Sequence, residues 1–247
     1  VRRAIYLAGQ TDTPLYIAHM TCREAIAELQ KAKGTGQRVS GETCTHYLTT
    51  TKEVLDNPDF NEAAKFVCSP ALRDQEDCEA LWPALAGGLL TAVSSDHCGI
   101  DVAGLKQAGR DDFTQIPNGS PGAGDRLHMV WTEGVCTGKL SRQKFVDVIA
   151  TQPAKINGIY PRKGTLAVGS DADIVIFDPS YEGVIRLADN PNGVDYNLYE
   201  GRRQSGRGET VLWRGQVVVE NAKFVGRYGQ GQFIPASMYA SGYENRN

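Results

Sequence analysis

Leu89-Leu90-Thr91-Ala92-Val93-Ser94-Ser95-Asp96-His97 is an apolar segment that ends in two serines, an acid and a histidine. Gly87-Gly88 precedes it and Cys98-Gly99 follows it, a pattern that predicts a buried β-strand. Continuous apolar strands are typical of parallel sheets covered on both faces. A buried carboxylate is costly unless it is paired or bound to metal. Asp96 therefore either caps the following loop or belongs to a site at the carboxyl end of the strand, where (β/α) barrels carry their chemistry.

Two more strands are predicted before this segment, at 13–20 and 37–46, and apolar residues at helical spacing follow the first strand and precede the Leu89 segment. In the first strand Leu15, Ile17 and His19 share one face, because side chains alternate along a strand. The alternation of strands and helices predicts an α/β fold with a parallel sheet and helical crossovers.

The pattern changes along the second half of the chain. Residues 99–124 form a long polar loop with Gly and Pro, and loops of this length in compact domains are usually functional. Beyond Pro161 the sequence predicts a small all-β unit, with a strand at 174–177 and a hairpin across 211–219. We therefore predict three parts: 1–160, an α/β part; 161–227, an all-β unit; and 228–247, a carboxyl-terminal arm.

Bulk composition excludes several classes of protein. The net charge is −3 and no Lys/Arg cluster is interleaved with aromatics, so no nucleic-acid partner is expected. No apolar run approaches the ~20 residues of a membrane span, so no membrane partner is expected. The six cysteines are scattered without a C-x-x-C pair, which indicates reduced thiols in a cytoplasmic protein.

Histidines and an acid at predicted strand ends are the candidate site. His19 and Asp96 would point into the same mouth of a parallel barrel, where imidazole and carboxylate suit zinc. The alternative for His19 is a hydrogen-bonded histidine at a strand end. His46 is a third strand-end histidine, either a supporting residue or a structural one. His97 should point to the opposite face from Asp96 and is a weaker candidate.

Five motifs follow one another along the chain: Tyr16–Cys22, Gly41–Leu48, Cys68–Arg73, Ser95–Cys98 and Ile116–Gly119. Together they resemble the D-hydantoinase/dihydropyrimidinase family of the amidohydrolases. Other catalytic signatures are missing from the sequence: a P-loop, a dinucleotide-binding Gly motif, a nucleophile elbow and an H-E-x-x-H helix. The segment from Gly164 to Asp178 also resembles the part of these proteins that returns to a small β-sandwich.

The resemblance implies the carboxyl-terminal part of a TIM-like (β/α)8 metallohydrolase barrel, followed by a small β-sandwich domain. It implies a centre of two zinc ions, with His19 as a metal ligand and Asp96 as both ligand and catalytic proton shuttle. It also implies that backbone groups at Ser69 and Asn118 hold a small cyclic amide substrate, and that the protein is a homo-oligomer, a tetramer. The reaction would open dihydropyrimidine or hydantoin rings to N-carbamoyl amino acids.

Several residues that the resemblance requires have no counterpart in this sequence. These are a His-x-His pair, a carboxylated lysine and a further histidine, all expected before Val1. We therefore expect this chain to be the carboxyl-terminal half of a longer protein, and inactive by itself. Two other functions stay open: a non-enzymatic scaffold of the collapsin-response type, and an allantoinase or dihydroorotase.

Overall fold

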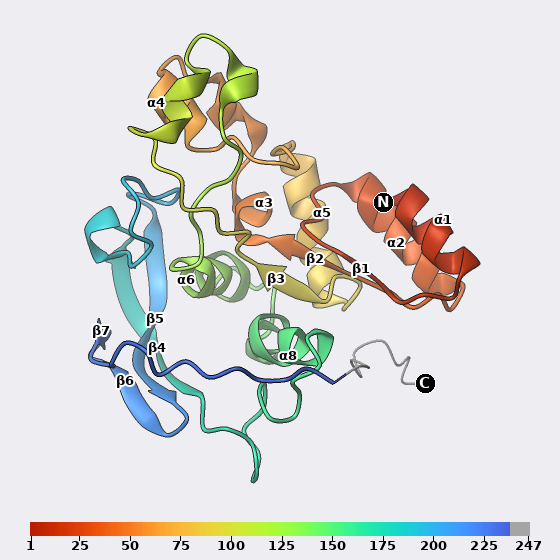
Figure 1. The fold of residues 1–247 in the computed structure, drawn as a ribbon, viewed down its shortest axis with the longest axis vertical. Helices are drawn as coiled ribbons and strands as arrows, with labels where there is room; N and C mark the ends of the chain where they lie inside the picture. Colours follow the sequence, from red (N-terminus) through yellow and green to blue (C-terminus); the bar gives the residue numbers. More distant parts are fainter. Residues whose placement is uncertain (238–247) are drawn as a thin grey trace.

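The computed structural model describes residues 1–237 and contains two β-sheets with helices packed around and between them (Figure 1). The elements are α1 Arg2–Gln10, β1 Leu15–Ile17, α2 Arg23–Gly34, β2 Val39–Cys44, α3 Thr45–Thr49, η1 Lys52–Asp56, α4 Phe60–Ala64, α5 Gln75–Ala86, β3 Ala92–Ser94, η2 Leu105–Gly109, η3 Phe113–Gln115, α6 Arg126–Val130, η4 Trp131–Val135, α7 Arg142–Val146, η5 Asp147–Thr151, α8 Gln152–Ile156, β4 Ile174–Val184, η6 Leu187–Asp189, β5 Arg203–Trp213, β6 Gln216–Glu220 and β7 Lys223–Phe224. None of the helices in this part of the chain is long and apolar enough to cross a membrane. Of the predicted arm at 228–247, residues 238–247 lie outside the described residues.

The first sheet has three parallel strands in the order β1-β2-β3, which confirms the predicted parallel pairing. Strand β3 is shorter than the predicted Leu89 segment. The Leu90 amide donates to the Ala84 carbonyl of α5 at 2.9 Å, so Leu89 and Leu90 still belong to the exit of that helix. Pairing with β2 begins only where the Thr91 amide donates to the Gly41 carbonyl at 2.8 Å.

The two faces of the central strand β2 have different roles. Gly41 faces the helical layer, because a Cβ on it would lie 2.5 Å from the Met20 Sδ and 3.4 Å from a Leu29 methyl group. Side chains alternate along a strand, so Glu42 and Cys44 point to the other face. The apolar core therefore forms on the side of α2 and α5, and polar side chains line the opposite side.

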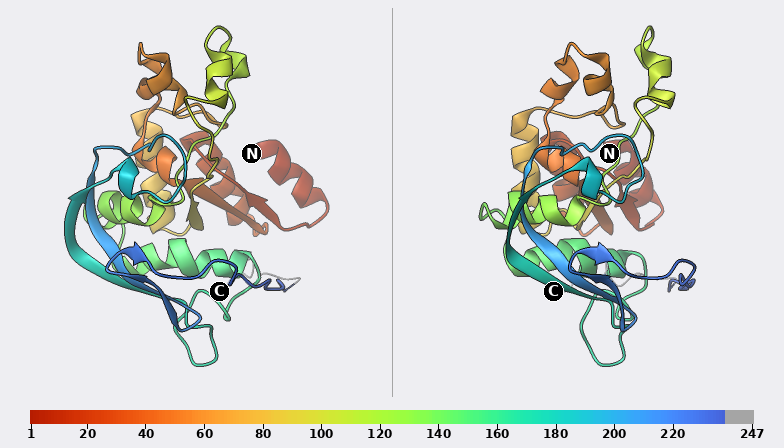
Figure 2. Two further views of the ribbon diagram at one scale, coloured as in Figure 1. Left: turned by 60° about the vertical axis from the view of Figure 1, so that its left-hand side comes forward. Right: turned by 90° about the vertical axis from the view of Figure 1, so that its left-hand side faces the viewer.

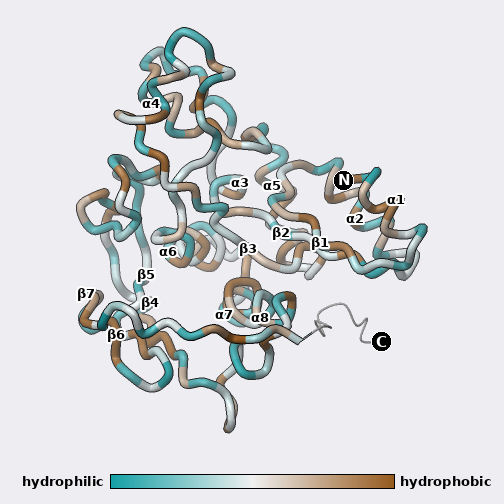
Figure 3. The backbone as a smooth tube through the Cα atoms, viewed as in Figure 1, coloured by the Kyte–Doolittle hydropathy of each residue, from teal (hydrophilic) through white to brown (hydrophobic). Residues whose placement is uncertain are grey.

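A cluster of aromatic rings joins the helices of the α/β part to the second sheet. Trp131 lies 5.3 Å from Phe145 and 4.6 Å from Phe177 of β4, measured between ring centroids. The helical run from α6 to α8 passes between the two sheets (Figures 1 and 2), and Figure 3 shows hydrophobic residues around β3, α6 and α7. The two parts thus share one core.

The second sheet is antiparallel, in the order β4-β5-β6-β7. Strands β5 and β6 form the predicted hairpin, with Trp213 opposite Gln216 and only Arg214 and Gly215 in the turn. Both turn residues have positive φ, 50° and 80°, as a two-residue type I′ turn requires. The described residues form a single sheet here, so the predicted sandwich and the closed barrel stay predictions.

Polar contacts tie the long loop after β3 to the segment after α4. The Ser120 hydroxyl donates to the Lys65 carbonyl at 2.6 Å, and the Gly119 amide donates to the Val67 carbonyl at 2.9 Å. The fully buried Lys106 ammonium donates to the Ala64 carbonyl at 2.8 Å. These two segments lie together beside α4 at the top of Figure 1.

Candidate functional site

The three predicted strand-end residues lie at equivalent places in the sheet. His19, His46 and Asp96 each follow the last residue of their strand by two positions, after β1, β2 and β3 respectively. Because the strands are parallel, all three lie at the same end of the sheet. His19 and Asp96 also have positive φ, 39° and 45°, a conformation that is uncommon for residues other than glycine and that clusters at functional sites.

The structure brings Asp96 together with His46 and Cys44. One ligand atom from each of these residues, the Cys44 Sγ, a His46 ring nitrogen and an Asp96 carboxylate oxygen, lies within 4.8 Å of the other two. His19 is close enough for its charge to lower the pKa of His46. Cys44 is not among the residues predicted from the sequence, although side chains alternate along a strand and Cys44 therefore shares one face of β2 with Glu42.

The electrostatics of His46 fit a metal ligand. The side chain is 5% exposed, and burial, reinforced by the charge of His19, lowers its pKa to about 4. The imidazole is therefore neutral at ordinary pH, the form that binds metal. Its Nε2 atom has no hydrogen-bond partner among the described residues, which is unusual for a buried polar atom. A donor set of thiol, imidazole and carboxylate with one unsatisfied nitrogen fits a zinc-type cation.

A chain of hydrogen bonds supports Cys44 from behind. The Cys44 Sγ lies 3.1 Å from the Ser94 Oγ, and the Ser94 hydroxyl donates to Glu42 at 2.8 Å. The other Glu42 oxygen accepts from the Tyr16 hydroxyl at 2.6 Å. Burial raises the pKa of the Cys44 thiol, so the sulfur holds its proton in the absence of a cation.

Ser69 and Asn118 are the predicted substrate-binding residues. They lie on two segments that a backbone hydrogen bond between Gly119 and Val67 connects. Both side chains are exposed, and the backbone link between the segments is the 2.9 Å hydrogen bond from the Gly119 amide to the Val67 carbonyl. The structure therefore places the two segments next to each other. Their contact with substrate stays a prediction.

His97 contacts the long loop and is not a member of the donor cluster. Its Nδ1 atom accepts from the Gly122 amide at 3.2 Å, and the side chain is exposed. Residue 97 also pairs with Ser120 as an isolated parallel bridge. His97 thus holds the end of the loop that carries Asn118. That it points to the opposite face from Asp96 stays a prediction.

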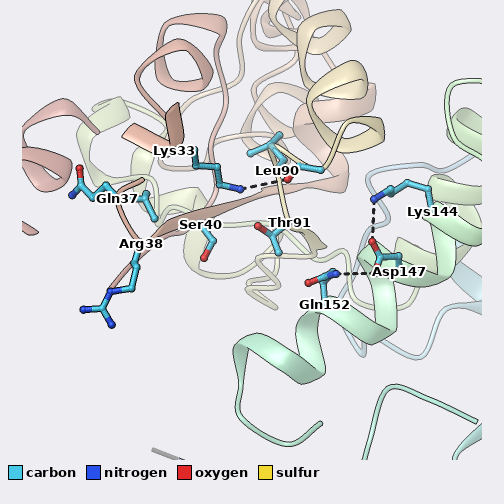
Figure 4. Close-up of a pocket in the computed structure, with 11 residues that line it drawn as sticks. Lys33, Gln37, Arg38, Ser40, Leu90, Thr91, Lys144, Asp147 and Gln152 are labelled. Atoms are coloured by element: carbon cyan, nitrogen blue, oxygen red, sulfur yellow. Dashed lines mark hydrogen bonds and ion pairs between the residues drawn. The ribbon is translucent and has the colours of Figure 1, made fainter. Parts of the chain in front are cut away.

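A separate cavity lies at the opposite end of the parallel strands. It is lined by residues at the end of α2, the start of β2, the segment between α5 and β3, and the helices α7 to α8, among them Lys33, Ser40, Thr91, Lys144 and Gln152 (Figure 4). Lys144 and Gln152 both bind Asp147 there. This cavity is at the amino ends of the strands, so it contains none of the candidate site residues.

Comparison with known proteins shows the family to which this chain belongs. The model of the amidohydrolase family matches residues 16–218. The chain belongs to the amidohydrolase family. The predicted resemblance to D-hydantoinases and dihydropyrimidinases is also confirmed. The D-hydantoinase of Ralstonia pickettii is 48% identical over 96% of this chain and 51% of that protein. The dihydropyrimidinase of Rattus norvegicus is 39% identical over 96% of the chain and 46% of that protein.

A solved structure agrees with these relatives. The dihydropyrimidinase from Brevibacillus agri superposes with a TM-score of 0.95 at 45% identity, covering 97% of this chain and 52% of that one. The chain therefore spans about half the length of the curated relatives and solved structures that it matches.

Proposed function

We propose that this chain supplies the Asp96 side of the active site of a cyclic amide hydrolase. The proposed reaction opens a dihydropyrimidine or hydantoin ring to an N-carbamoyl amino acid. The observation that carries the proposal is the position of Asp96: it lies beside two side chains that could ligate a metal, at the carboxyl ends of parallel strands. The names of the relatives, D-hydantoinase and dihydropyrimidinase, support this substrate class.

We propose zinc as the cofactor, two ions in the complete site, with His19 and Asp96 as ligands from this chain. Imidazole and carboxylate are ligands that suit zinc, and the unsatisfied Nε2 atom of His46 supports a cation at this place. A bound zinc ion lowers the pKa of water to ≈ 7 and polarises a carbonyl oxygen.

The residues of the chain have two tasks in this reaction. The Asp96 carboxylate takes the proton from the attacking water and passes it to the leaving ring nitrogen, acting first as general base and then as general acid. Backbone groups at Ser69 and Asn118 hold the ring amide, so that attack is effectively intramolecular. The hydrogen bond between Gly119 and Val67 fixes the two holding segments relative to each other.

The wider architecture is part of the proposal. We propose that the three parallel strands belong to a TIM-like barrel, that the antiparallel sheet belongs to a β-sandwich, and that the boundaries fall at 160 and 227. The likeness to the Brevibacillus agri dihydropyrimidinase supports this arrangement. A homotetramer in the cytoplasm stays a prediction.

A chimera tests the proposed reaction. The 247 residues replace the matching segment of the Ralstonia pickettii D-hydantoinase, to which they are 48% identical. Ring opening is followed by ultraviolet absorbance with hydantoin, dihydrouracil, allantoin and dihydroorotate as substrates. We expect turnover of hydantoin or dihydrouracil, and Asp96→Asn should lower kcat by roughly 10²-fold or more, since proton transfer by a positioned group contributes that much.

The matched control for the chimera is Asp111→Asn, at an exposed aspartate of the long loop, which should keep full activity. A folded, metal-loaded chimera that opens only allantoin or dihydroorotate would replace the proposed substrate class. A folded, metal-loaded chimera with no turnover on any of the four rings would favour the scaffold function.

A further inference from the structure

The candidate site contains two possible ligand atoms besides those of His19 and Asp96, the zinc ligands that the resemblance implies. Cys44, the last residue of β2, and His46, two positions beyond it, bring a sulfur and a ring nitrogen to the Asp96 carboxylate, all within 4.8 Å of one another. Cys44 is fully buried and His46 is 5% exposed. The His46 Nε2 atom has no partner among the described residues.

We propose that Cys44, His46 and Asp96 together bind one thiophilic divalent cation, of which zinc is the natural choice. The site needs no residue from outside this chain. It deepens the proposed function by assigning two further ligands around Asp96, and it rests on that function only through Asp96. The fourth position is left for water or substrate, as in zinc sites with three protein ligands.

The distances require only a small closure of the site. Zinc bonds of about 2.3 Å to sulfur and about 2.0–2.2 Å to nitrogen and oxygen in tetrahedral geometry put the donors roughly 3.3–3.6 Å apart. Donors that now lie within 4.8 Å of one another must therefore approach by at most about 1.2–1.5 Å. Asp96 is half-buried, at the start of the loop after β3, and it is the member with most room to move.

The surroundings of Cys44 can accept the change in the thiol. The Ser94 hydroxyl donates to Glu42, so its oxygen accepts from the thiol at a distance of 3.1 Å. When the cation binds, the S–H bond breaks, the sulfur electron pair forms the bond to the metal, and the proton leaves to solvent. The Ser94 hydroxyl can then turn and donate to the sulfur, while Glu42 keeps its hydrogen bond from Tyr16.

The donor set also predicts which cations bind. Thiolate and imidazole select zinc and similar soft or borderline ions, whereas magnesium and calcium prefer oxygen ligands. A site that consisted of the Asp96 carboxylate alone would not distinguish zinc from magnesium or calcium. We therefore expect the site to bind zinc, cobalt and cadmium, and to ignore a large excess of magnesium.

Cobalt spectroscopy on the purified 247-residue chain tests the proposal without any measurement of turnover. We expect one cobalt ion per chain, with a sulfur-to-cobalt charge-transfer band in the near ultraviolet and displacement by zinc. Cys44→Ser should abolish the band and lower zinc affinity, measured by competition with a chelator, on the order of tenfold or more. His46→Gln should lower the affinity by a similar factor and keep the band.

The matched controls are Cys136→Ser, at an exposed thiol, and His128→Gln, at a half-buried helical histidine outside the cluster. Both should bind metal like the parent. Circular dichroism of each metal-free variant shows whether it is folded, and if Cys44→Ser is not, Cys44→Ala and His46→Gln carry the test. Cobalt bound without a sulfur band, a band unchanged in the Cys44 variants, or no bound metal would each overturn the proposal, and none of these results depends on the hydrolase activity.

Discussion

At the scale of single residues, Lys106 is the most unusual ionisable group. It has no exposed surface, and burial lowers its pKa to about 8, against an ordinary value of 10.5. Between these values the unfolded chain holds a proton that the folded chain has released, so the contribution of Lys106 to stability increases as the pH rises from about 8 toward 10.5. We expect the free energy of unfolding, relative to that of Lys106→Met, to increase from about pH 7 to about pH 9.5.

Urea unfolding of both proteins at the two pH values provides the measurement. The difference between the proteins is the informative quantity, because buried thiols such as Cys78, whose pKa is raised to about 11, reduce stability in the same range. Lys223→Met, at an exposed lysine of β7, is the matched control and should show no such difference. An identical pH dependence for the parent and Lys106→Met would contradict the prediction.

The sequence predicted site residues where a strand pattern pointed to them. His19 and Asp96 could be placed at the same end of the sheet because each follows an apolar segment of strand length. The cluster of Cys44, His46 and Asp96 could not be predicted from the sequence. Cys44 ends β2 and His46 lies in the helix after it, and only the fold brings these two residues to Asp96. Lys106 could not be predicted, since a lysine in a polar loop gives no sign of burial.

At the scale of elements, Gly206 of β5 controls how the second sheet packs on the helices. Its φ is 72°, and a Cβ there would lie 2.5 Å from Phe177 and 2.8 Å from Trp131. Gly206→Ala adds backbone strain of about 1–2 kcal/mol and overpacking of about 1–3 kcal/mol. Gly215→Ala, in the turn after β5, adds only the strain, because its φ is 80° and the nearest atom would be 4.0 Å away.

Urea unfolding of the two variants should therefore differ, with Gly206→Ala less stable than Gly215→Ala by about 1–3 kcal/mol. Equal losses of stability would mean that the aromatic cluster yields to the added methyl group without cost. Both variants change a glycine with positive φ in the same β unit, so the difference isolates the contact with Phe177 and Trp131.

Strands with apolar alternation were predictable and polar ones were not. The hairpin across 211–219 was found from its valines and its turn, whereas the first half of β5, Arg203 to Gly208, has no apolar pattern. That half is held instead by polar contacts: the Ser205 amide donates to the Thr132 hydroxyl at 2.9 Å, and the Arg203 guanidinium binds Glu182. Such contacts depend on residues far away in the sequence, so local periodicity does not reveal them.

At the scale of the whole molecule, the sequence separated two parts and did not show how they join. The periodicity change after Pro161 predicts a β unit distinct from the α/β part. The two sheets differ in strand pairing, parallel in the first and antiparallel in the second, and the boundary at 160 stays a prediction. The joint between them is the ring cluster of Trp131, Phe145 and Phe177. Aromatic residues in separate helices and a strand carry no sequence signal for mutual contact, so this part of the core required the structure.

The whole-molecule geometry also predicts what the 247-residue chain does alone. Within residues 1–237 the parallel sheet has three strands, and β1 and β3 each have only β2 as a neighbour, so these strands cannot close into a barrel. Among the described residues the only group of three or more candidate donors is Cys44, His46 and Asp96, which suffices for one cation. Unpaired strand edges also favour association with another chain.

We expect the purified chain, supplied with excess zinc, to bind no second ion tightly and to open neither hydantoin nor dihydrouracil. Metal content after gel filtration and loss of ultraviolet absorbance measure the two properties. Turnover with two zinc ions per chain would show that three strands suffice to build a working site, and that ligands such as His19 complete it without further strands.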